Sequence, residues 1–88
     1  MTDQYHIGSF VVHCQPGQTN SVRRAIGAMP GAEIHACTED GKLVVTLERE
    51  DRTDMQVGME AIATLSGVLS AALTYHRVEA LDELRENG

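Results

Sequence analysis

Four histidines and two cysteines have the widest chemical range in this sequence, because imidazole and thiolate groups ligate metals and take part in catalysis. His13 and Cys14 are neighbours in a predicted strand, so their side chains point to opposite faces. His35 and Cys37 are expected to share a face, but two ligands do not complete a tetrahedral site. The sequence therefore predicts no metal site, and nothing in it indicates another cofactor. The six residues are His6, His13, His35, His76, Cys14 and Cys37.

Hydroxyl and imidazole groups could also form a catalytic pair. Ser9, Ser70, His13 and His76 are expected to lie near one another on one side of a sheet. A nucleophile needs a base and an orienting third group within reach, and a flat sheet excludes no water. Each of the four is equally explained as a strand residue, so the sequence predicts a protein that is not an enzyme.

Arg23 and Arg24 form a twin-arginine pair in the middle of the chain. The pair lies on a predicted helix and no apolar tract follows it. It is therefore interpreted as the solvated face of a helix and not as an export signal.

Size and charge restrict the function further. The 88 residues allow one domain, and a cleft would remove much of so small a core, which favours a binding surface. The formal net charge is −6, so neither nucleic acid nor an anionic membrane is an expected partner. The charge favours a basic partner, because a negative field steers cations, although solubility alone also explains the acidity.

Cysteine usage and the first residues indicate the compartment. Cys14 and Cys37 have no CxxC spacing and are too few for the disulfide framework of a small secreted domain. Residues 1–6 show no basic region followed by an apolar stretch, and no apolar run is long enough to span a membrane. We expect a monomer in the cytoplasm with reduced thiols.

Four strands are predicted from β-branched and apolar runs, over residues 5–14, 32–38, 43–50 and 68–78. Two amphipathic stretches between them predict helices, the first capped by Thr19 or Asn20 and the second capped by Asp51 or Thr53. The expected buried stripes of the two helices are Val22, Ile26 and Met29, and Met55, Met59, Ile62 and Leu65.

The order of these elements is β-α-β-β-α-β, which predicts an α+β, ferredoxin-like split βαβ fold over residues 1–78. Right-handed crossovers place both helices on one face of a four-stranded antiparallel sheet, with the first and third strands in the middle. The other face is left uncovered. Residues 79–88 are acidic and predict a flexible C-terminal tail.

The composition of the uncovered face follows from alternation along the strands. On the helix side we expect Phe10, Val12, Leu43, Val45, Leu47, Leu69, Ala71, Leu73 and Tyr75. The uncovered face then carries small, β-branched or hydroxylated side chains, none of them Lys or Arg. These are Ile7, Ser9, Val11, Val44, Thr46, Ala72 and Thr74, flanked by His13, Glu48 and His76. Alternation in the last strand also places Val68 and Ser70 on this side. Such residues also suit central strands in general, but they would make a mildly apolar platform for a partner's apolar segment.

Other proteins with this fold can be compared directly. Metal-carrying versions place a CxxC motif after the first strand, where this sequence has Gln15-Pro16-Gly17-Gln18. RNA-binding versions set aromatic side chains among basic residues on the open face, whereas Phe10 is the only phenylalanine here. Ligand-sensing modules lack a sharp signature, so a small-molecule-sensing regulatory module stays an alternative function.

Short segments along residues 5–76 resemble the NapD family, cytoplasmic chaperones of the catalytic subunit of periplasmic nitrate reductase. Their order and spacing carry the resemblance more than any one segment does. Cys14 and Cys37 are not recognised as a feature of the family and receive no role. The matching segments are Ser9-Phe10-Val11-Val12, Met29-Pro30-Gly31-Ala32-Glu33-Ile34, Gly41-Lys42-Leu43-Val44-Val45, Gly67-Val68-Leu69 and Tyr75-His76.

The resemblance implies a chaperone that binds the twin-arginine signal peptide of the nitrate reductase precursor. It would delay export until the molybdenum cofactor has been inserted and the enzyme has folded. It implies neither catalysis nor a cofactor. The apolar stretch of the peptide would lie on the uncovered face, and Glu48, with Glu33 and Glu50 behind it, would meet the arginines in bidentate pairs.

Overall fold

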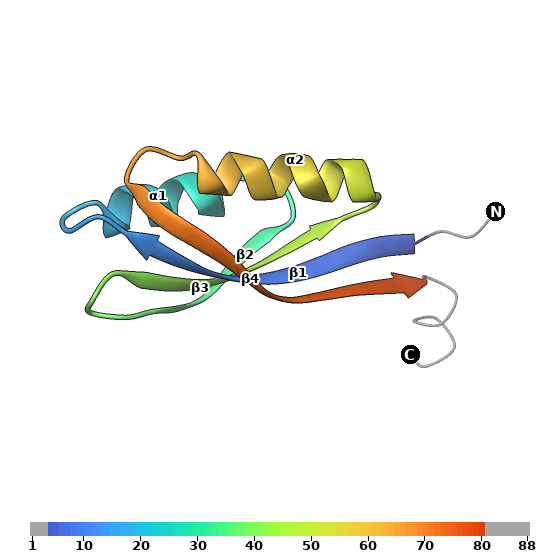
Figure 1. Ribbon diagram of the computed structural model, residues 1–88, viewed down its shortest axis with the longest axis horizontal. Helices are drawn as coiled ribbons and strands as arrows, with labels where there is room; N and C mark the ends of the chain where they lie inside the picture. The colour runs from blue at the N-terminus through green and yellow to red at the C-terminus, as the bar shows by residue number, and fades with distance from the viewer. Residues whose placement is uncertain (1–3, 81–88) are drawn as a thin grey trace.

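The computed structural model describes residues 4–80 and contains the six elements in the predicted order (Figure 1). They are β1 (Gln4–Cys14), α1 (Thr19–Gly27), β2 (Ala32–Cys37), β3 (Lys42–Arg49), α2 (Arg52–Ala63) and β4 (Val68–Ala80). The predicted α+β, ferredoxin-like fold is confirmed. β4 continues two residues beyond its predicted end, so residues 79 and 80 belong to the sheet. The rest of the predicted tail lies outside the described residues.

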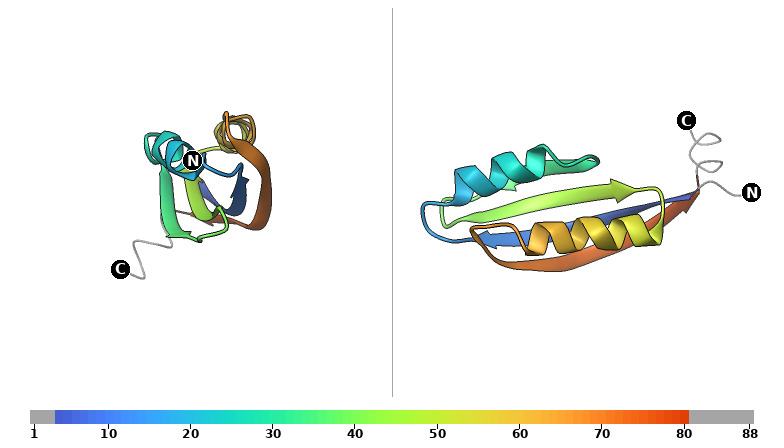
Figure 2. Two further views of the ribbon diagram at one scale, coloured as in Figure 1. Left: turned by 90° about the vertical axis from the view of Figure 1, so that its left-hand side faces the viewer. Right: turned by 90° about the horizontal axis from the view of Figure 1, so that it is seen from above.

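The sheet has the strand order β2-β3-β1-β4, with every neighbouring pair antiparallel. β1 and β3 are the central strands, as predicted, and β2 and β4 form the edges. Figure 2 shows both helices on the same side of the sheet. Within residues 4–80, the opposite face carries no covering element. We call it the open face.

The core lies between the helices and the even-numbered side chains of β1. Phe10 and Val12 are at most 3% exposed, and the odd-numbered residues of β3 next to them are fully buried. Burying each such side chain stabilises the fold by about 1.5–3 kcal/mol. The predicted helix stripes are confirmed, since Val22, Ile26, Met55 and Ile62 are buried and Met29, Met59 and Leu65 pack against them.

The two helices begin in different ways. Asp51 caps α2 as predicted, because its carboxylate accepts a hydrogen bond of 2.7 Å from the backbone N–H of Asp54. The prediction for α1 is wrong, because the helix begins at Thr19 and Gln18 stands at the cap without a side-chain bond. None of the helices in the described chain is long and apolar enough to cross a membrane.

A glycine in the turn before β2 allows close contact with β3. Gly31 has a φ of +79°, and a Cβ atom there would lie 2.2 Å from the carbonyl oxygen of Glu48. The carbonyl of Gly31 accepts a hydrogen bond of 2.9 Å from the N–H of Glu48. Only glycine combines this backbone angle with this approach, so the turn helps to fix Glu48 at the end of β3.

Candidate functional site

The centre of the open face is a short apolar row beside a hydroxyl row. On β1, Val11 lies between Val44 of β3 and Ala72 of β4. One step along β1 on the same face, Ser9 lies opposite Thr46. Val44 is 37% exposed, and Val11 and Thr46 are half-buried by their neighbours. The structure thus brings together six of the residues expected on this face: Ile7, Ser9, Val11, Val44, Thr46 and Ala72.

β4 contains two bulges, and each shifts its alternation by one residue. The first is at Thr74, because Ser9 pairs with Tyr75 whereas Phe10 pairs with Leu73. Thr74 was expected to present its hydroxyl on the open face. Instead it occupies the bulge, and the hydroxyl donates a hydrogen bond of 3.1 Å to the carbonyl of Ser9.

The bulge at Thr74 reverses two predictions. Tyr75 was expected in the core, but it pairs with Ser9 on the open face and is 53% exposed. His76 was expected on the open face, but it pairs with Gly8 on the helix side. There its ring stacks on buried His6, with 3.1 Å between Nδ1 of His6 and Nε2 of His76. The open face thus carries the phenol ring of Tyr75 in place of the expected imidazole of His76.

The second bulge is at Leu69, because His13 pairs with Ser70 whereas Cys14 pairs with Val68. Val68 packs against the core, although it was expected outside, and Leu69, expected inside, is 63% exposed. Leu73 faces the helix side as predicted, opposite Phe10, but at the sheet edge it remains 45% exposed.

A bulge in β2 separates two residues that were expected to share a face. Ile34 pairs with Val45 but Ala36 pairs with Val44, so His35 is the extra residue. Nε2 of His35 lies 2.7 Å from the Thr46 hydroxyl, which belongs to the open face. Cys37 pairs with Leu43 on the helix side. The prediction that His35 and Cys37 share a face is therefore wrong.

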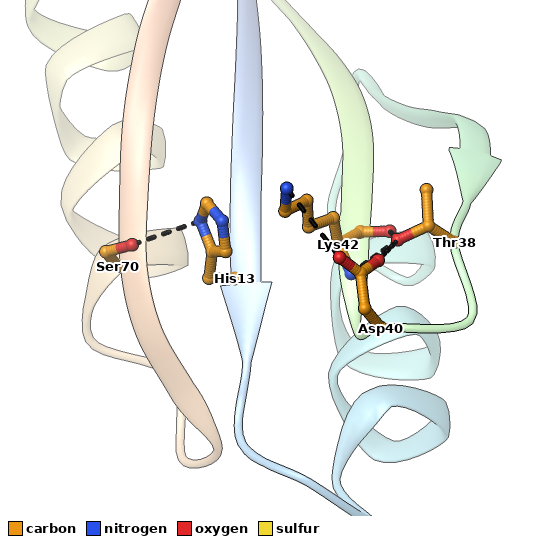
Figure 3. Close-up of polar contacts among 5 residues, drawn as sticks. All are labelled: His13, Thr38, Asp40, Lys42 and Ser70. Atoms are coloured by element: carbon orange, nitrogen blue, oxygen red, sulfur yellow. Dashed lines mark hydrogen bonds and ion pairs between the residues drawn. The ribbon is translucent and has the colours of Figure 1, made fainter.

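A polar cluster closes one end of the open face (Figure 3). His13 lies between Lys42 and Ser70, and its Nδ1 is 3.3 Å from the Ser70 hydroxyl. Nζ of Lys42 lies 3.7 Å from Oδ2 of Asp40. The other carboxylate oxygen of Asp40, Oδ1, accepts a hydrogen bond from the Thr38 hydroxyl. That bond from Thr38 is the main reason why the pKa of Asp40 is below its ordinary value. The cluster thus combines an ion pair, an imidazole and hydroxyls.

An acidic corner occupies the other end, on the β2 and β3 side. Glu48 pairs with Ile7 and Glu33 pairs with Thr46, so the two exposed carboxylates are diagonal neighbours on one face. Glu50 follows directly after the last residue of β3. Arg77, which pairs with Ile7, lies in the same row on β4. We define the acidic corner as Glu33, Glu48 and Glu50.

Sequence reasoning missed four residues that the structure places on or beside this face: Tyr75, Arg77, Lys42 and His35. Lys42 lies one position before the predicted strand of residues 43–50, and the alternation of that strand extended back by one position would have included it. The other three depend on bulges. One signal was present for the bulge in β4, because the isolated Gly8 in β1 lies beside it, and an isolated glycine in a strand often marks such a position.

The two cysteines are free thiols with different surroundings. Cys14 is buried and Cys37 is exposed. Burial raises the pKa of the Cys14 thiol above 9.0, the nearby Cys37 raises it further, and a hydrogen bond with Thr19 acts in the opposite direction. Across residues 4–80, no group of three His, Cys, Asp or Glu side chains could hold a metal ion.

Comparisons with known proteins agree on one family. The sequence model described as NapD protein matches residues 5–80. A relative from Paracoccus pantotrophus, Chaperone NapD, is 31% identical over 78 residues, which cover 89% of this chain and 69% of the relative. The solution structure of the E. coli Tat proofreading chaperone protein NapD matches with a TM-score of 0.79 at 27% identity, over 88% of this chain and 82% of that one.

Proposed function

The chain belongs to the NapD family, and we propose that it binds the twin-arginine signal peptide of the periplasmic nitrate reductase precursor through its open face. Bound in the cytoplasm, it would delay export until the cofactor has been inserted and the enzyme has folded. It acts as a monomeric binding protein and not as an enzyme. The open face, apolar at its centre and acidic at one corner, is the observation that carries the proposal.

The peptide and the face have complementary patterns. A twin-arginine signal has a basic pair followed by an apolar stretch. Two adjacent guanidinium groups can meet Glu48 and Glu33, which are diagonal neighbours. From there the apolar stretch passes over the row of Val11, Val44 and Ala72. Lys42 and Arg77 lie at other positions of this face, so the acidic corner is the place on it that best suits a basic pair.

Magnitudes assign most of the affinity to apolar contact. An exposed guanidinium–carboxylate pair contributes about 1 kcal/mol or less, whereas nanomolar binding corresponds to about −12 kcal/mol. The two pairs therefore orient the peptide more than they hold it. Tyr75, which is 53% exposed on the open face, adds an aromatic side chain of the kind that often dominates binding energy.

Regulation follows from mass action. While the chaperone covers the signal, the translocase cannot read it, so the free fraction of signal sets the rate of export. Release is then a dissociation step, and the strength of the apolar contact sets its rate. The chaperone delays export for as long as the contact lasts and needs no chemistry of its own.

Calorimetry with a synthetic signal peptide tests the proposal. The peptide should bind, and changing both of its arginines to glutamine should weaken binding by up to about thirtyfold, the largest loss expected for two exposed ion pairs of about 1 kcal/mol or less each. A protein variant with Glu33→Gln and Glu48→Gln should bind the original peptide as weakly, and the two losses should not add. Glu60→Gln, on the exposed side of α2, is the matched control.

A folded protein that ignores the peptide would contradict the proposal. If its melting temperature then rose with a small metabolite, the small-molecule-sensing alternative would take its place. If the peptide binds equally strongly with and without its two arginines, only the role of the acidic corner is contradicted, and the role of the apolar row stands.

A further inference from the structure

A groove of about 630 Å³ runs between α1 and β2, along an outer edge of the sheet. Asn20, Arg23, Arg24 and Gly27 line it from the helix, and residues 34–37 line it from the strand. These helix positions are spaced i, i+3, i+4 and i+7, so they form one face of α1. Val22 and Ile26 form another face, which packs into the core. The helix therefore buries one stripe and presents a second, cationic stripe beside the strand.

Among residues 4–80, the two arginines of the groove have no acidic partner in an ion pair. Arg23 donates a hydrogen bond of 3.3 Å to the side-chain oxygen of Asn20. Neither Arg23 nor Arg24 forms any of the ion pairs found among residues 4–80. The chain has 13 acidic and 7 basic side chains, so its net charge is negative. Two adjacent arginines without a carboxylate in an ion pair form a local positive patch on this acidic protein. The groove therefore presents two cations that no described carboxylate neutralises by an ion pair.

The strand side of the groove offers main-chain groups. β2 is an edge strand that pairs only with β3, and an edge strand presents unpaired N–H and C=O groups to a further strand. With six residues and one bulge it is a short template, so main-chain pairing alone would hold a partner weakly. Charge must supply the rest of the recognition.

Gly27 keeps the groove open. A Cβ atom at this position would meet no other atom within 4 Å, and its φ is not in the left-handed region. Neither the packing nor the backbone angle therefore requires glycine here. Glycine also disfavours a helix, so its presence is not explained by the stability of α1. The missing side chain leaves free space beside the two guanidinium groups.

From the charge, the free edge and the open space together, we propose that this groove binds an acidic, extended segment of a partner polypeptide. The segment adds a strand to the outer edge of β2 and places its carboxylates against Arg23 and Arg24. The site selects negative charge, whereas the acidic corner selects positive charge. It does not depend on the function proposed for the open face.

The test uses a synthetic hexapeptide in which glutamate alternates with valine, added to the full-length ¹⁵N-labelled protein. Backbone shifts should change at Arg23, Arg24 and residues 34–37, and the outward amides of β2 should exchange more slowly with solvent. Added salt should weaken the binding, because part of it is electrostatic. The same peptide with lysine in place of glutamate should leave the groove unchanged.

Two variants separate the contribution of the arginine charges to peptide binding from that of the free space beside Gly27. Arg23→Glu combined with Arg24→Glu should weaken binding about tenfold or more, whereas Arg52→Glu, an exposed arginine outside the groove, should not. Gly27→Leu keeps both arginines but fills the free space. It should abolish binding while the melting temperature stays the same or rises, because leucine is the better helix former.

Three outcomes would overturn the inference. One is the absence of shifts at millimolar peptide, and a second is a set of shifts confined to the open face. The third is that the peptide shifts the groove resonances without slowing exchange in β2 and that inorganic phosphate produces the same shifts, which would make the groove a site for small anions.

Discussion

The two faces of the sheet are built from alternate residues of the same strands, yet they follow different rules. On β3, Val45 is fully buried under the helices and its neighbour Val44 is 37% exposed on the open face. Packing at nearly crystalline density fixes the covered side, where a single lost methyl group is felt. The open face has no such constraint, so its composition can serve a partner. Identical residue types one position apart are thus under different packing constraints.

The strongest test of this contrast is Val45→Lys against Val44→Lys. The first places an unpaired charge in the core and should unfold the domain, at a cost of more than about 4 kcal/mol. The second should change the free energy of unfolding by less than about 1 kcal/mol. It should also weaken binding of the signal peptide about a hundredfold, because it removes apolar contact and repels the arginines. Urea unfolding and calorimetry measure both effects, and equal stability losses would show that the faces are assigned wrongly.

A finer test concerns the beginning of β4, where the bulge at Leu69 exchanges the sides of Val68 and Leu69. Val68→Ser should lower the free energy of unfolding by about 1–2 kcal/mol, because Val68 packs against the core. Leu69→Ser should lower it by less than about 0.5 kcal/mol, since Leu69 is 63% exposed. Regular alternation without the bulge predicts the opposite order. Chemical denaturation of the two variants therefore decides whether the bulge exists in solution.

The smallest expected effect concerns the buried thiol. The pKa of Cys14 is raised in the folded protein, so folding favours the neutral thiol. This contribution to stability is complete below the ordinary value of 9.0 and is lost as the pH rises through the higher folded value. The unfolding free energy should therefore fall between pH 8 and 10 by more in the natural protein than in Cys14→Ala. Cys37→Ala, at an exposed thiol, should keep most of the pH dependence.

Most of the fold could be predicted from sequence because covered positions leave a strong pattern. Leu43, Val45 and Leu47 alternate with less apolar residues, and the pattern succeeded in β3 and in both helices. It failed in β4, where the segment from Val68 to Val78 has apolar residues of both parities. Side chains of an edge strand are partly exposed on both faces of the sheet, so a bulge there costs little folding free energy. The sequence of such a strand therefore shows no clear alternation that would reveal the bulge. The positions of Tyr75 and His76 could not be derived without the pairing of β4 with β1.

The bulges of β4 also affect the tendency of this edge strand to pair with other copies of the chain. This 13-residue strand at the margin of the sheet carries Leu69, Leu73, Tyr75 and Val78, all substantially exposed. A straight strand of that kind would invite other copies to line up alongside it and grow into fibrils. Two kinks interrupt the repeat of its hydrogen-bonding groups. The bulges thereby make this apolar edge strand a poor template for pairing with a second copy of the chain.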